Sequence, residues 1–98
     1  MRDRNRATDT PAPLTEETRL LLGRLADHLD HRRPHALMLE PIRLARALVL
    51  AEQLHGPTEQ AYAAEQALLA AAPPVDHDQT RAQYAALLRR IAAEGAGR

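Results

Sequence analysis

The apolar residues of this 98-residue chain are almost entirely Ala and Leu, and this choice constrains the fold more than any other feature. Phe and Trp are absent, the two tyrosines are Tyr62 and Tyr84, and Val and Ile together number four. Ala and Leu lead the helix scale, whereas strands favour β-branched and aromatic residues. The chain is also long enough to bury one core without disulfides. The sequence therefore predicts an all-α protein.

Helical spacing of the apolar residues predicts four helices, at residues 15–30, 41–55, 58–72 and 76–94. Thr15 and Thr58 are of the residue type that N-caps prefer. Asp76, followed three positions later by Gln79, fits a capping box for the last helix. The connections are short, so we expect a single domain over residues 14–95, built as a four-helix bundle or a bundle-like array of short antiparallel helices.

The first 13 residues carry the expectations about location. Residues 1–13 alternate charged and polar groups and end on Pro11 and Pro13, so we expect a disordered N-terminal arm. This start has no apolar region of the kind that a secretory signal needs. No apolar stretch of the chain reaches the roughly 20 residues that cross a bilayer. We therefore expect a cytoplasmic protein that does not contact a membrane.

Cys, Ser and Lys are also absent from the chain. Without Cys there is no disulfide, thiolate zinc site or thiol nucleophile. Without Ser or Cys the usual acyl-transfer triads cannot form, and without Lys neither a Schiff base nor a Walker-type phosphate loop is possible. These absences favour a non-enzymatic protein that needs no cofactor.

Histidines near the end of the first predicted helix offer one metal-site hypothesis. His28 and His31 lie three residues apart, so a helix places them on the same side, where they could share a divalent ion. Asp27, Asp30 or His35 would complete the site. The alternative is a solvated last turn, in which His residues complement the negative end of the helix. We favour that alternative.

One carboxylate lies on an apolar helix face. Glu65 falls among Ala and Leu residues of helix 58–72, and Arg81 occupies a similar position on the last predicted helix. A carboxylate in such surroundings is either paired or raised in pKa by desolvation. We therefore predict a structural ion pair between Glu65 and Arg81.

The charge balance argues against a nucleic-acid-binding surface. Thirteen arginines face thirteen acidic residues, and the formal net charge is zero. Helices 41–55 and 58–72 have the outline of a helix-turn-helix, but residues 47–80 contain no Arg, and a helix in a groove needs cations against phosphate. A nucleic-acid-associated regulator that uses the scattered arginines and the N-terminal arm stays as the alternative function.

The helix at 41–55 is apolar around most of its circumference, with a narrow polar strip near Arg43 and Arg46. We expect it either to be the central helix or to face a partner. In a small chain, surplus apolar surface is typical of a dimer or partner interface. We therefore predict a non-catalytic protein-interaction module that binds itself or another protein. Its predicted contact residues are Leu37, Leu39, Ile42, Leu44 and Leu48.

Overall fold

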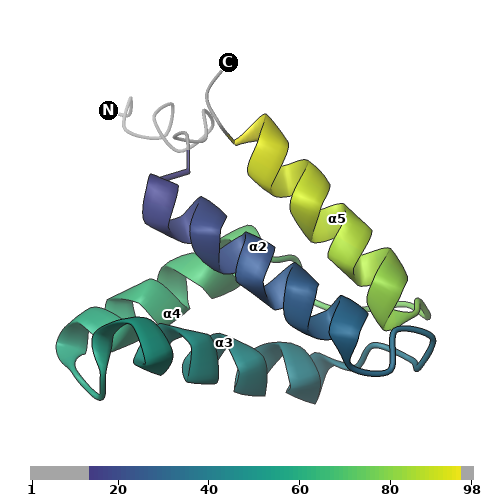
Figure 1. The fold of residues 1–98 in the computed structure, drawn as a ribbon, viewed down its shortest axis with the longest axis horizontal. Helices are drawn as coiled ribbons and strands as arrows, with labels where there is room; N and C mark the ends of the chain where they lie inside the picture. Colours follow the sequence, from purple (N-terminus) through teal and green to yellow (C-terminus); the bar gives the residue numbers. More distant parts are fainter. Residues whose placement is uncertain (1–13, 96–98) are drawn as a thin grey trace, which may run out of the picture.

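The computed structural model describes residues 14–95, which form four α-helices and no β-strand (Figure 1). The helices are α2 (Glu16–His31), α3 (Glu40–His55), α4 (Glu59–Ala71) and α5 (Arg81–Glu94). They confirm the predicted all-α fold and its bundle-like arrangement. The predicted N-terminal arm, residues 1–13, lies outside the described residues. None of these four helices is long and apolar enough to cross a membrane.

The helices pack as two pairs. α5 lies along α2, α4 packs against α3, and α2 also contacts both α3 and α4 (Figure 1). The central helix is therefore α2. Of the two alternatives for helix 41–55, to be central or to face a partner, the first is wrong. The reason is that α2 has neighbours on several sides, whereas α3 packs mainly against α4 and touches α2 less extensively.

One hydrophobic core lies between the helices, and α2 supplies its largest share. Leu21, Leu22, Leu25 and Leu29 of α2 are completely buried. The other three helices contribute many small side chains, which allow close approach between helices. The alanines and the larger core residues of these three helices are Ala47, Leu50 and Ala51 of α3, Ala61, Ala64 and Leu68 of α4, and Tyr84, Ala85 and Leu88 of α5.

Side-chain caps confirm two of the predicted helix starts. Thr15 Oγ1 accepts a hydrogen bond from the Thr18 N–H at 3.1 Å, and Thr58 Oγ1 accepts one from the Ala61 N–H at 3.3 Å. α3 ends at His55 and is followed by Gly56, whose φ of 71° suits glycine because it has no Cβ. The end of α3 and the cap of α4 are therefore separated by only a short turn.

The predicted start of the last helix at residue 76 is wrong. α5 begins at Arg81, after an N-cap at Thr80. The capping box exists, but it is formed by Thr80 and Gln83 and not by Asp76 and Gln79. Both pairs have the same spacing, so the local pattern does not distinguish them.

A long-range pairing of loop backbone explains where α5 begins. The Arg81 N–H donates to the Ala36 carbonyl oxygen and the Ala82 N–H donates to the Pro34 carbonyl oxygen, each at 2.9 Å. The first N–H groups of a helix have no partner within it, so this loop satisfies two of them. The Met38 N–H also donates to the Gln79 carbonyl oxygen at 2.8 Å, which holds the chain before α5 extended.

Candidate functional site

The predicted interaction surface is exposed at four of its five residues. Leu37 and Leu39 of the loop before α3 are 48% and 47% exposed, and Leu44 and Leu48 of α3 are 45% and 42% exposed. Leu44 and Leu48 lie four residues apart and therefore on the same side of α3. We call these four residues the exposed leucine surface. The described helices leave more than 40% of each of these four residues exposed.

Ile42, the fifth predicted residue, has a different position. Its side chain is half-buried, packs against the core and lines a cavity described below. It lies two residues from Leu44, and residues two apart on a helix point in different directions. Ile42 therefore does not extend the exposed leucine surface.

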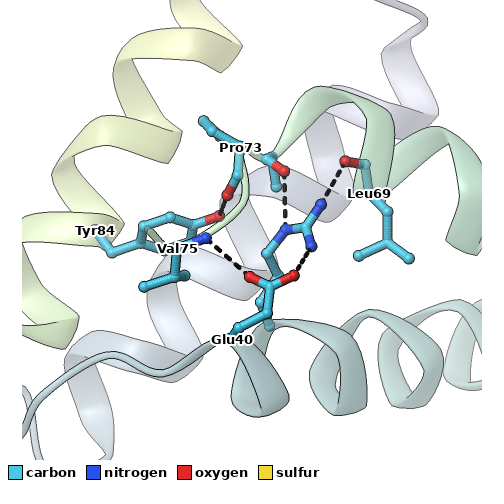
Figure 2. Close-up of polar contacts among 7 residues, drawn as sticks. Glu40, Leu69, Pro73, Val75 and Tyr84 are labelled. Carbon is cyan, nitrogen blue, oxygen red and sulfur yellow. Dashed lines mark hydrogen bonds and ion pairs between the residues drawn. The ribbon is translucent and has the colours of Figure 1, made fainter. Parts of the chain in front are cut away.

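The sequence places Arg43 near the polar strip of α3, but the structure leaves only 6% of this residue exposed. Its Nε donates to the Ala72 carbonyl oxygen at 3.0 Å, and its Nη2 donates to the Leu69 carbonyl oxygen at 2.9 Å (Figure 2). Its Nη1 forms an ion pair with the Glu40 carboxylate. The guanidinium therefore joins the start of α3 to the end of α4.

Glu40 and Tyr84 complete this polar cluster. The second oxygen of Glu40 accepts a hydrogen bond from the Val75 N–H at 2.8 Å, and the Tyr84 hydroxyl donates to the Pro73 carbonyl oxygen at 2.5 Å (Figure 2). Burial raises the pKa of Tyr84 to about 12. We call Glu40, Arg43 and Tyr84, with their backbone partners, the Arg43 cluster. Its polar groups satisfy one another, which is typical of a structural role.

His31 and the two carboxylates of the metal hypothesis already have other partners within the chain. His31 Nδ1 lies 2.7 Å from the Asp27 carbonyl oxygen. The carboxylates of Asp27 and Asp30 both bind the Arg89 guanidinium of α5, at 2.8 and 2.5 Å. Within residues 14–95 no three His, Asp or Glu side chains are grouped so that they could hold a metal ion.

The predicted ion pair between Glu65 and Arg81 is absent from the described part of the chain. Arg81 Nη1 donates instead to the Arg32 carbonyl oxygen, at 3.0 Å. Because α5 begins at Arg81, this side chain lies against the end of α2 and not against the middle of α4. Glu65 is half-buried on α4.

A cavity of about 320 Å³ opens where the end of α2 meets the starts of α3 and α5. It is lined by His28, Arg32 and Arg33 from the α2 end, by Arg46 from α3 and by Arg81 from α5. Burial, and then the charges of Arg46, Arg32 and Arg81, lower the pKa of His28. The sequence shows these arginines as scattered, because the fold and not the spacing brings them together.

Of the features described above, the exposed leucine surface and the arginine-lined cavity are open to a partner or ligand. The Arg43 cluster is internally satisfied. The carboxylates beside the histidines are engaged by Arg89. Comparisons of the chain with protein-family models, curated proteins and solved structures found no match.

Proposed function

We propose that this protein is a non-catalytic helical interaction module that self-associates through the exposed leucine surface. The observation that carries the proposal is that Leu44 and Leu48 are each more than 40% exposed on the same side of α3, in a chain whose core leucines are buried. Leu37 and Leu39 add apolar area immediately before this helix. Burial of such area on association stabilises a complex by about 25 cal/mol per Å² before the costs of association.

A second copy of the chain is the partner that the charges favour. The net charge is zero, so two copies do not repel each other at long range. A two-fold symmetric dimer uses the same patch on both subunits, so a single apolar surface is sufficient. Leu44 and Leu48 would then pack against their counterparts, with charged residues such as Glu52 at the rim.

Sedimentation equilibrium over a range of protein concentrations tests this proposal. The wild-type chain is expected to dimerise, and a double variant, Leu44→Gln with Leu48→Gln, is expected to raise the dimer Kd by tenfold or more. Tenfold corresponds to about 1.4 kcal/mol, less than two fully buried leucines contribute.

The matched control is a double variant with Leu20→Gln and Tyr62→Gln, which replaces two residues that are also exposed, on α2 and α4. It is expected to leave the Kd unchanged. A wild-type chain that stays monomeric at every concentration would contradict self-association. So would a dimer that the control weakens as much as the α3 variant does.

A further inference from the structure

The arginine-lined cavity gathers positive charges that no acidic side chain of the described residues pairs with. Four guanidinium groups and one imidazole line it, and no Asp or Glu does. The ion pairs found between residues 14 and 95 use Arg43, Arg89 and two other histidines, but none of these four arginines. The site is therefore a strongly cationic hollow in a chain with zero net charge.

The end of α2 accounts for only a small part of this charge. A helix C-terminus carries about half a negative charge, which arginines complement favourably. Arg32 and Arg33 follow α2 directly and fit that explanation. Arg46 and Arg81 come from α3 and α5, and four cations far exceed what one helix end requires.

Two arginines of the cavity lining have local arrangements that are unfavourable for folding alone. The Nε of Arg81 is buried and has no hydrogen-bond partner among the described residues. A buried donor without a partner destabilises the folded chain. Arg33 has a φ of 57°, in the left-handed region where Gly or Asn normally ends a helix. Strained backbone of this kind occurs preferentially at ligand-binding positions.

We propose that this cavity binds a small anion that carries a phosphate group. Guanidinium groups donate paired hydrogen bonds to phosphate oxygens, and a tetrahedral phosphate presents oxygens in several directions. This geometry suits donors that arrive from three elements, as they do here from the α2 end, α3 and α5. A planar carboxylate has only two oxygens and would engage fewer of them.

The size and setting of the cavity favour a small ligand over a nucleic acid. Its volume of about 320 Å³ falls at the lower end of the range for small-molecule sites. The charge does not continue along the rest of α3 or along α4, because residues 47–80 contain no Arg or Lys. A long polyanion needs successive cations along its path, and α4 offers none. Apolar groups of Pro41 and Ala45 in the lining suit the organic part of a phosphate monoester.

His28 supplies a reporter inside the cavity. The groups that face it are cationic on every element packed around it: Arg32 on its own segment, Arg46 on α3 and Arg81 on α5. A bound phosphate adds negative charge next to the ring and therefore raises the pKa of His28. This site and the exposed leucine surface involve different residues, so phosphate binding does not depend on self-association.

NMR titration of the His28 ring resonances with inorganic phosphate, at constant ionic strength set with NaCl, tests the proposal. We expect saturable shifts and a raised His28 pKa at saturation. The Arg46→Gln variant is expected to weaken phosphate binding by tenfold or more. Arg90→Gln, which removes the same charge from an exposed position of α5, is the matched control and is expected to change affinity by less than twofold.

A second variant, Arg33→Gly, separates binding from folding. Glycine accepts the left-handed backbone without strain, so the thermal midpoint is expected to stay the same or rise while phosphate binding weakens. Linear shifts that never saturate, or equal losses in Arg46→Gln and Arg90→Gln, would overturn the proposal. A single-stranded oligonucleotide that binds the same residues far more tightly than inorganic phosphate would replace it with nucleic-acid binding.

Discussion

α2 and α3 are both 16 residues long and rich in Leu, yet the structure uses them in opposite ways. α2 buries Leu21, Leu22, Leu25 and Leu29 completely. α3 carries apolar residues around more of its circumference but leaves Leu44 among those exposed. A single apolar stripe therefore marks the helix at the centre of this fold better than an apolar circumference does. Excess apolar residues on α3 indicate surface that lacks a neighbour.

The two helices are also held by different forces. α2 lies between α5 and the α3–α4 pair, so burial of large apolar side chains fixes it from several sides. α3 buries mostly alanines, and its start is tied to the end of α4 by the Arg43 guanidinium. The apolar attachment of α2 should therefore respond to cavities, and the polar attachment of α3 to the loss of hydrogen bonds.

The largest expected effect comes from truncating a central leucine of α2. Leu25→Ala removes a completely buried side chain and should lower the free energy of unfolding by about 3–5 kcal/mol. Leu48→Ala on α3 should change it by less than about 0.5 kcal/mol, because that side chain is exposed and lies outside the core. Urea unfolding at a protein concentration below the dimer Kd measures both. Equal losses from the two variants would show that α3 is as central as α2.

The next effect concerns the polar attachment of α3. Arg43→Met keeps a long apolar stem but leaves the Glu40 carboxylate and two backbone carbonyl groups without their donor. We expect a loss of about 2–3 kcal/mol, within the range for hydrogen bonds to charged groups. Adding Glu40→Gln should recover part of it, since this removes the unpaired charge.

The matched control for Arg43→Met is Arg90→Met, at an exposed position of α5. It is expected to stay within about 0.5 kcal/mol of the wild type in the same urea experiment. If Arg43→Met proved as harmless as this control, α3 would be held by apolar contacts after all. The contrast with α2 would then be one of degree.

Local sequence patterns predict a helix start correctly where that start depends on residues close by in the chain. Thr15 and Thr58 each cap the helix that follows them, as predicted, because an N-cap bonds to the backbone two or three residues away. The start of α5 was misplaced because the carbonyls of Pro34 and Ala36 decide it, more than 40 residues earlier in the chain. No local pattern carries that information.

The candidate sites also divide into features that the local sequence predicts and features that only the fold brings together. The exposure of Leu44 and Leu48 could be anticipated, because α3 has more apolar surface than one neighbour covers. The burial of Arg43 could not, since two of its partners are backbone carbonyl groups that any residue would present. The cavity was missed for a related reason: its arginines come from three separate elements, and only the fold places Arg46 beside Arg81.

The smallest expected effect is a pH dependence that arises at Tyr84, on the α5 side of the Arg43 cluster. Tyr84→Phe removes the hydrogen bond to the Pro73 carbonyl oxygen and should cost about 1 kcal/mol at neutral pH. Burial raises the Tyr84 pKa from 10.0 to about 12, so the unfolded chain loses this proton first as the pH rises. The stability that Tyr84 contributes is therefore complete below pH 10 and is lost between pH 10 and 12.

Tyr62→Phe leaves Tyr84 as the only tyrosine, so an absorbance titration of that variant reports on Tyr84 alone. Its thermal midpoint should fall more steeply above pH 10 than that of the variant that also carries Tyr84→Phe. Ionisation of Tyr84 near pH 10 in the folded chain would mean that water reaches the hydroxyl and that the polar attachment of α3 is looser than the structure shows.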